Sequence, residues 1–575
     1  MRREAGIAFM VLPLRVRWAA ALCALSFAAV WVAQRAAHVS LIDVMVYRAA
    51  GQTVRAGGDL YAMRATPAML PMTYPPFAGL LFVPLTWLGV APMRTAVTAG
   101  NLLLTVVLAA LSLRLVLRRR PGAAAVLGTA AGAVWSEPVW STLRYGQVNI
   151  LLVCLVLWDF TRRPDSRLAG AGTGLAAAIK VTPLLFLVVL AGAAVATRGQ
   201  GTCWLRRLLT AAGTFAGATL LAAAALPHDS LRYWTDCAFA PGRSGSAVNV
   251  ANQSVRGIVA RAQHTPHPTA VWLVLAVLVA ALGTAVAVAA LAAGPRLPRG
   301  TAWAVVAAGV TSLLVSPISW THHWVWDVPL VVLVCYEALQ RRTPGWYAGA
   351  AACVVAFCCA AMWMLPHGPG SPELRENAAQ ILVAALYPLA GIAFLATAAA
   401  VTPGWSVARL KRPGFGRGAR TEPAGAPRGG LAREAVRFCA VGAAGVLVNL
   451  GVYNLLRHYT SLLVVQAGAI ATLAAIAFNY VGLRFFTYRD CDPRRRLRRI
   501  TLFLAFSVVG AAIENGVFYG ETRGLGWSSP LRSSTGKVVG IALATAFRFW
   551  AYRTWVFTFL PAARETPRPA ADEGS

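Results

Sequence analysis

Long apolar runs recur along most of the chain, and they constrain its fold more than any other feature. Of the 575 residues, 58% are hydrophobic and 13% are charged, whereas a soluble domain carries roughly 25% charged residues. Continuous apolar runs of about 18 or more residues are typical of transmembrane helices. The pattern therefore predicts an all-α, polytopic membrane protein and excludes a soluble globular enzyme.

The apolar runs predict about ten to twelve spans. Residues 74–91 break the alternation of sides if they cross the membrane, so we expect a re-entrant segment there. Residues 168–197 form two apolar halves around Lys180 and Pro183, which is typical of a broken helix lining a cavity. The other spans are expected near 17–36, 95–117, 123–141, 146–161, 205–226, 270–293, 301–317, 323–339, 345–365 and 379–401.

The charged residues indicate which side each loop faces. Lys and Arg number 53 and Asp and Glu number 21, which gives a net charge of +32. Such an excess can serve nucleic-acid binding, but here the arginines lie in short loops such as 118–120 and 494–499, as the positive-inside rule describes. We therefore expect a multi-pass protein of the cell membrane, with cytoplasmic termini and no nucleic-acid partner.

One boundary divides the chain. Residues 402–433 are rich in Pro, Gly and Arg and lack apolar periodicity, which favours a flexible linker.

The part of the chain after the linker contains an internal repeat. Residues 478–488 resemble residues 547–557, which predicts a duplicated two-helix hairpin of a kind common in carriers. The expected domains are a large membrane domain at 1–405, a basic cytoplasmic linker at 406–433, a four-helix membrane domain at 434–560 and a disordered tail at 561–575.

Asp43 is the leading candidate for a catalytic group. It directly follows the first predicted span, where the helix meets the outer water, and Tyr47 lies one helical turn further on the same face. A carboxylate at this position can equally be a solvated residue that ends a helix, and position alone favours neither interpretation.

Further polar residues are expected on the same outer side. Taken singly, each can be an interfacial polar cap or a snorkelling cation. Together they predict a wet, cationic cavity suited to a phosphate group and to sugar hydroxyls. They are Tyr74 in TYPPF, Arg144, Gln147 and Asn149 in RYGQVN, Lys180 in IKVTP, Asn252 and Gln253 in ANQS, and His322 and His323 in WTHHW.

These motifs, in this order, resemble glycosyltransferase family 87 over about residues 15–405. The resemblance implies a helical bundle of the GT-C type that takes a sugar from a polyprenyl phosphate and gives it to a cell-envelope glycolipid or polysaccharide. It implies that Asp43 is the catalytic base and that His322, with Lys180 or Arg144, contacts the donor phosphate. By the same resemblance, the substrate contacts are Tyr47, Gln147, Asn149, Tyr74, Asn252, Gln253 and His323.

The expected chemistry requires few groups. One carboxylate can take the proton of the acceptor hydroxyl in an inverting single displacement, and cations can stabilise the leaving phosphate. The predicted outer loops contain no DxD pair, so we expect neither a metal nor a cofactor.

Residues 430–560 resemble the GtrA family through RFCAVGAAGVLVN and NYVGLRFFTY. The resemblance implies that this part binds or translocates the lipid-linked sugar. Glu514, Lys537, Asn449 and Arg484 are candidates for a headgroup path, although Arg484 can also simply anchor a helix end at the cytoplasmic side.

The sequence thus predicts a membrane glycosyltransferase that acts on the outer side and uses polyprenyl-phosphate-mannose. Two alternatives stay open at this point. One is an arabinofuranosyltransferase that uses polyprenyl-phosphate-arabinose. The other is a flippase of lipid-linked sugars without transferase activity, which would need no general base at the outer interface.

Overall fold

The computed structural model describes residues 13–163, 166–197, 203–268 and 271–403, together with short stretches between 442 and 552. The chain divides into two compact units, Met1–Arg412 and Pro413–Ser575. The described residues are helical and contain two isolated β-bridges, Ala65–Leu70 and Asn252–Trp320. The all-helical prediction is therefore confirmed, while the finer domain boundaries stay predictions.

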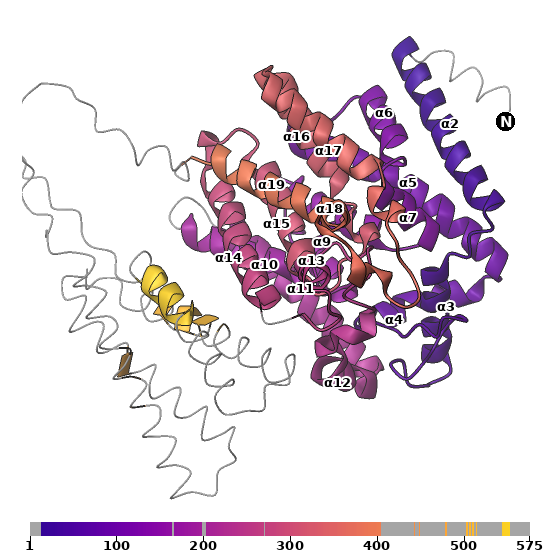
Figure 1. The fold of residues 1–575 in the computed structure, drawn as a ribbon, viewed down its shortest axis with the longest axis horizontal. Coiled ribbons are helices and arrows are strands. Elements are labelled where there is room, and N and C mark those ends of the chain that lie inside the picture. The colour runs from indigo at the N-terminus through magenta and orange to yellow at the C-terminus, as the bar shows by residue number, and fades with distance from the viewer. Residues whose placement is uncertain are drawn as a thin grey trace, which may run out of the picture. The chain divides into compact units, whose positions relative to one another are not determined.

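The first unit is a bundle of α-helices joined by short 3-10 turns (Figure 1). Its first half contains α2 (Leu14–Ala36), α3 (Ile42–Arg55), α4 (Pro76–Phe82), η1 (Val83–Trp87), α5 (Val90–Leu117), α6 (Ala123–Ala133), α7 (Glu137–Tyr145), α8 (Asn149–Phe160), α9 (Ala171–Ile179) and α10 (Leu184–Ala196). Its second half contains α11 (Cys203–Ala225), α12 (Pro227–Thr235), η2 (Cys237–Phe239), η3 (Pro241–Ser244), α13 (Val255–Ala262), α14 (Val271–Ala292), η4 (Gly294–Arg296), α15 (Gly300–Val315), η5 (Thr321–Trp324), α16 (Asp327–Arg341), α17 (Pro344–Cys358), η6 (Ala361–Met364), η7 (Pro372–Arg375), α18 (Ala378–Ala384) and α19 (Leu386–Val401).

Four of the described helices are long and apolar enough to cross a membrane, namely α2, α5, α11 and α14. A fifth span is formed if α18 and α19, which meet at an angle of 68°, count together. Each apolar run predicted as a span contains a helix, but several of these helices have only 11 to 16 residues. The chain is a multi-pass membrane protein, and the total of ten to twelve spans stays a prediction.

Both irregular segments that the sequence indicated are broken in the structure. α9 ends at Ile179, Lys180 is extended with φ −147° and ψ 131°, and α10 begins after Pro183. Before α5 begins at Val90, the segment at 74–91 contains α4 and η1, which together extend about 20 Å. That length is shorter than the hydrocarbon core of about 30 Å, which favours the re-entrant interpretation.

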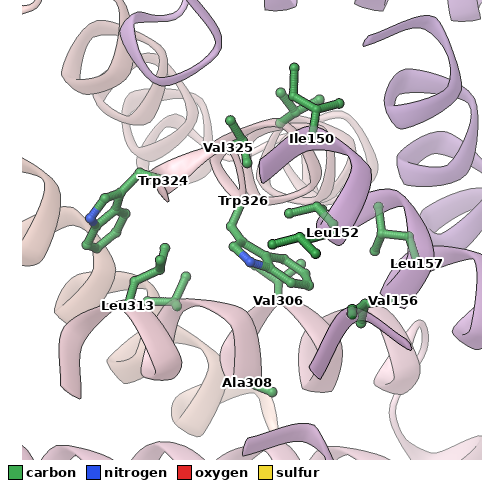
Figure 2. Packing of buried hydrophobic residues seen from close by; sticks show 14 of the residues in the cluster. Ile150, Leu152, Val156, Leu157, Val306, Ala308, Leu313, Trp324, Val325 and Trp326 are labelled. Atoms are coloured by element: carbon green, nitrogen blue, oxygen red, sulfur yellow. The ribbon is translucent and has the colours of Figure 1, made fainter. Parts of the chain in front are cut away.

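Large aromatic side chains fill the core beside the residues that carry the polar motifs. Trp324 is fully buried, and the ring of Trp326 stacks on Phe186 with centroids 5.4 Å apart. Figure 2 shows Leu152 of α8 and Val306 of α15 packed around Trp326. The segment that follows His322 and His323 is therefore held in place from two sides, and this packing makes the preceding turn rigid.

In the second unit, residues 543–551 are helical and the hydroxyls of Ser507 and Tyr552 lie 2.6 Å apart. The four candidates for a headgroup path, Glu514, Lys537, Asn449 and Arg484, lie outside the described residues. Their predicted role therefore stays a prediction.

Candidate active site

A cavity of about 990 Å³ lies where α3, the loop before α4, the turn between α7 and α8, the break between α9 and α10, and η5 meet. Asp43 is the sole carboxylate among the described residues that line it. The polar and aromatic lining consists of Asp43, Tyr47, Arg64, Thr73, Tyr74, Tyr145, Gln147, Lys180, Thr182, Tyr233, Arg243, Ser244, Asn249, Ser316, Trp320, Thr321, His322, His323 and Trp363.

The start of α3 presents Asp43 to this cavity. Leu41 precedes the helix in the left-handed conformation, with φ 50°, so the chain turns sharply between the end of α2 and the start of α3. Asp43 lies in the first turn of α3, where the exposed N–H groups of a helix favour a negative charge. Tyr47 follows on the buried face, and its ring stacks on Phe82 with centroids 4.3 Å apart.

The amide of Gln147 connects Asp43 to two tyrosines. Gln147 Nε2 donates to Asp43 Oδ2 at 2.6 Å. Gln147 Oε1 accepts from the hydroxyls of Tyr47 at 2.6 Å and Tyr74 at 2.9 Å. Since the carboxylate can only accept and both hydroxyls donate, the orientation of the amide is fixed. The carboxylate is therefore held on one side, and its other oxygen stays available to a ligand.

Gly146 makes the turn that places Gln147. It has φ 71° and ends α7, while the backbone N–H of Gln147 donates to Thr142 O at 3.0 Å. A Cβ on Gly146 would lie 3.0 Å from Val44 Cβ, and residues other than glycine rarely adopt this conformation. The glycine of the YGQVN motif therefore allows α7 and α8 to approach α3.

Burial raises the pKa of the Asp43 carboxyl to about 6, against smaller opposing effects of the Gln147 hydrogen bond and the Lys180 charge. Asp43 lies outside the candidate spans. A pKa near the working pH is what general acid–base catalysis favours. The carboxyl can thus be ionised at neutral pH and still bind a proton readily.

Lys180 supplies a buried cation to the cavity that Asp43 also lines. It lies at the break between α9 and α10, its Nζ donates to Asn149 Oδ1 at 3.1 Å, and it lies 5.4 Å from the centre of the Tyr74 ring. A charge at such a depth is costly unless it is paired or wet. Lys180 therefore has capacity for an anionic ligand in the cavity.

The two histidines lie in η5. Side chains of α7 and α8 fix this turn by donating hydrogen bonds to the backbone carbonyl of His322. His322 O accepts from Thr142 Oγ1 and from Asn149 Nδ2, both at 2.9 Å. The rings of His322 and His323 are perpendicular, with centroids 4.8 Å apart. Asn149, which bonds Lys180 as well, thus fixes the lysine and the histidine turn relative to each other.

His322 Nε2 is buried and has no hydrogen-bond partner among the residues that the structure describes. Burial, and to a lesser extent the Lys180 charge, lowers the pKa of both histidines well below the usual range. They are therefore neutral at physiological pH and can offer an N–H donor to a ligand. The expectation that cations surround the phosphate applies to Lys180 and not to the histidines.

The structure brings most of the predicted site residues together. Asp43, Tyr47, Tyr74, Gln147, Lys180, His322 and His323 line the cavity, and Asn149 supports it from a neighbouring void. Arg144 does not line it: this residue is exposed on α7. Because Arg144 and Gln147 lie on either side of the turn at Gly146, their side chains leave the chain in different directions.

Asn252 and Gln253 brace the cavity wall without lining it. Asn252 Oδ1 accepts from the backbone N–H of Ser319 at 2.9 Å. Gln253 Nε2 donates to Ala384 O at 2.7 Å, and Gln253 Oε1 accepts from the N–H of Tyr387 at 3.3 Å. These side chains are fully buried. They position the loop before η5, so the geometry favours a structural role over direct substrate contact.

Several residues that line the cavity were not predicted. Arg64, Arg243 and Asn249 come from the long loops that the sequence predicts to lie outside, and Trp320 and Trp363 contribute two large aromatic faces. Arginine and tryptophan in an outer loop are a weak signal, because both also anchor ordinary membrane interfaces. Their contribution becomes clear only when the loops are folded over the same cavity.

Two family models match the chain. The model described as glycosyltransferase family 87 matches residues 72–317, a range that includes Gln147 and Lys180, while Asp43 precedes it and His322 and His323 follow it. The model described as GtrA/DPMS, transmembrane domain, matches residues 437–557.

Curated relatives extend the similarity. A polyprenol-phosphate-mannose-dependent alpha-(1-2)-phosphatidylinositol mannoside mannosyltransferase of Mycolicibacterium smegmatis is 31% identical over 366 residues, which cover 59% of this chain and 78% of the relative. The protein of the same description from Mycobacterium tuberculosis is 33% identical over 52% of this chain and 71% of the relative. A polyprenol-phosphate-mannose-dependent alpha-(1-2)-phosphatidylinositol pentamannoside mannosyltransferase of M. tuberculosis is 32% identical over 53% of this chain and 68% of the relative. No solved structure is significantly similar to the chain.

Proposed function

Because the chain belongs to glycosyltransferase family 87 and carries a C-terminal GtrA/DPMS transmembrane domain, we propose that it transfers mannose from polyprenyl-phosphate-mannose to a phosphatidylinositol mannoside. Family membership makes it a glycosyltransferase, which removes the alternative of a flippase without transferase activity. The relatives named above use a mannose donor, which favours mannose over arabinose.

The observation that carries the proposed mechanism is that, among the described residues, the cavity is lined by a single carboxylate. Asp43 lines the same cavity of about 990 Å³ as Lys180 and the two neutral histidines, and this volume is large enough for a sugar phosphate and an acceptor sugar. A retaining mechanism with a covalent intermediate would need a second carboxylate as nucleophile. One carboxylate fits an inverting displacement.

In this mechanism, Asp43 accepts the proton of the acceptor hydroxyl as that oxygen attacks the anomeric carbon of the donor. The bond between the anomeric carbon and the phosphate oxygen breaks, and its electron pair leaves with polyprenyl phosphate. The products are the new glycoside and the polyprenyl phosphate. Protonated Asp43 then returns its proton to water.

Charge develops on the phosphate as it leaves, and donors aimed at that charge lower the barrier. We assign this role to Lys180 and to a neutral N–H of His322, since both line the same cavity as Asp43. Tyr47, Tyr74 and Gln147 position the base through the amide bridge. The substrate contacts of Asn149 are indirect in this scheme, because its side chain holds Lys180 and the His322 carbonyl.

The pH profile follows from the raised pKa of Asp43. The base works only when ionised, so kcat/KM is expected to rise as the pH increases through about 6 and to level off above that. Initial rates from pH 5 to 8, at low concentrations of both substrates, test this. A profile with no inflection between pH 5 and 7 would contradict the assigned environment of Asp43.

We propose that the cavity opens to the extracytoplasmic side, because the loops rich in arginine lie at the opposite ends of the helices. In a background without exposed native cysteines, Met69→Cys at the cavity rim should react with a membrane-impermeant maleimide in intact cells. Arg119→Cys should react only after the membrane is opened. Labelling of position 119 but not position 69 in intact cells would contradict this orientation.

We propose that the C-terminal domain binds the lipid-linked donor or moves it across the membrane. A sugar-phosphate headgroup does not cross the apolar core unaided, since burying unpaired polar groups is costly. A chain that ends near residue 405 should therefore retain transfer in detergent but lose most of it in cells. Equal activity in cells with and without residues 434–560 would contradict delivery, and loss in detergent would indicate a structural role.

A further inference from the structure

A second cavity of about 410 Å³ lies beside the active-site cavity and shares none of its lining residues. The two cavities adjoin at the start of α3, because Leu41 lines the second and the next residue, Ile42, lines the first. The second cavity is lined by Trp31, Gln34, Arg35, His38, Val39, Leu41, Arg94 and Thr98.

The lining of this cavity is cationic and contains no carboxylate among the described residues. Arg35 donates through one terminal nitrogen to Thr95 Oγ1 at 2.7 Å, and its guanidinium lies 5.6 Å from the centre of the Trp31 ring. Arg94 Nε is buried and has no hydrogen-bond partner within the described part of the chain. Two guanidinium groups without a carboxylate partner favour a phosphate, whose oxygens match the planar fork of arginine.

Gln34 provides a second, independent indication of a ligand. Its exposed fraction is 6%, and neither Nε2 nor Oε1 has a hydrogen-bond partner in the described residues. Leaving a buried donor or acceptor unpaired is costly, because the group loses its hydrogen bonds to water without replacement. An amide with two unpaired atoms beside two arginines indicates that polar atoms from outside the chain complete this cavity.

The position of the cavity indicates that its ligand is a lipid. Gln34 and Arg35 lie in the last turns of the candidate span α2, and Arg94 lies near the start of the candidate span α5. Tryptophan and arginine at the ends of spans are typical of the headgroup level. Below the cavity, α2 exposes apolar side chains such as Leu25 and Val32, along which acyl chains can lie.

We propose that this second cavity binds the phosphodiester headgroup of an anionic phospholipid. Arg94 and Arg35 bind the phosphate oxygens, and the Gln34 amide donates through Nε2 to the same headgroup. The apolar ends of α2 and α5 hold the upper parts of the acyl chains. The bound lipid thereby fixes the turn at Leu41, two residues before Asp43, which we assign as the catalytic base.

Native mass spectrometry of the full chain, released from nanodiscs that contain phosphatidylcholine and phosphatidylglycerol, tests this proposal. The wild-type protein is expected to retain phosphatidylglycerol in preference to phosphatidylcholine. Arg94→Gln and Gln34→Leu should each weaken that retention, Arg94→Gln by about tenfold or more, because hydrogen bonds to charged groups are the stronger ones. The matched control is Arg55→Gln, which removes one positive charge from α3 outside both cavities.

Thermal unfolding in detergent, with and without added phosphatidylglycerol, gives a second readout. Stabilisation by the lipid should be present in the wild type and in Arg55→Gln and absent in Arg94→Gln. Equal retention by Arg94→Gln and the wild type would overturn the proposal. The lipid assignment would also be wrong if inorganic phosphate alone stabilised the wild type as strongly as the phospholipid did.

Discussion

Replacing Asp43 by asparagine is expected to lower kcat by about 10²- to 10⁴-fold, the range that a positioned general base contributes. Asparagine keeps the size of the side chain, and its carbonyl oxygen can still accept from Gln147 Nε2. The variant therefore loses the proton acceptor while its contacts stay in place. Single-turnover transfer of labelled mannose to a phosphatidylinositol mannoside, with donor and acceptor saturating, measures the loss.

The matched control for this prediction is Asp236→Asn, which neutralises an exposed carboxylate outside the cavity. The control should transfer mannose at the wild-type rate. Expression, thermal stability and donor binding should be close to wild type in both variants. If Asp43→Asn retained near wild-type turnover, another group would be the base, and the proposed role of Asp43 would be wrong.

Replacing Lys180 by methionine is expected to reduce kcat/KM for the donor by roughly 10- to 150-fold, since hydrogen bonds to charged groups contribute about 1.5–3 kcal/mol. Methionine preserves most of the apolar stem, so the break between α9 and α10 keeps its packing. The KM for the acceptor should change much less, because we assign the lost cation to the phosphate of the donor. Steady-state kinetics with each substrate varied in turn separate the two effects.

Arg144→Met is the matched control for Lys180→Met. It also removes a cation that the sequence predicted as a contact of the donor phosphate, but Arg144 is exposed and does not line the cavity. We expect its donor kinetics to stay close to wild type. A loss in Arg144→Met that equals the loss in Lys180→Met would show that our proposed assignment of the phosphate contacts is wrong.

Much of the helical architecture can be predicted because hydropathy acts locally. Four apolar runs are long enough to be recognised as spans from their composition alone, and they form α2, α5, α11 and α14. The break at Lys180 is equally predictable, because a charge followed three residues later by a proline cannot continue an apolar helix at low cost. The short helices were harder to predict, since hydropathy does not show where a run such as 123–141 divides into α6 and α7.

The candidate site was predictable where a polar residue interrupts an apolar run, as at Asp43 and Lys180. Neighbouring residues within one motif could not be separated in this way. RYGQVN contains Arg144 and Gln147, and only the left-handed turn at Gly146 decides which of them reaches Asp43. The bracing role of Asn252 depends on contacts with Ser319, far away in the sequence, and no local pattern shows such a contact.

The second cavity was not predicted, because its residues are ordinary for the ends of membrane helices. Arg35, Arg94 and Trp31 each resemble an interfacial anchor when considered alone. Their arrangement around the unpaired amide of Gln34 depends on how α2 packs beside the start of α5, and hydropathy carries no information about that packing.

Product analysis tests the central claim most directly. Membranes that contain the full chain are incubated with polyprenyl-phosphate-[¹⁴C]mannose and a purified phosphatidylinositol mannoside, and the lipids are separated and digested with α-mannosidase. We predict a labelled glycolipid, larger by one mannose, that loses its label on digestion and is absent with Asp43→Asn. Label that remains entirely in polyprenyl-phosphate-mannose with the wild-type protein would contradict the account.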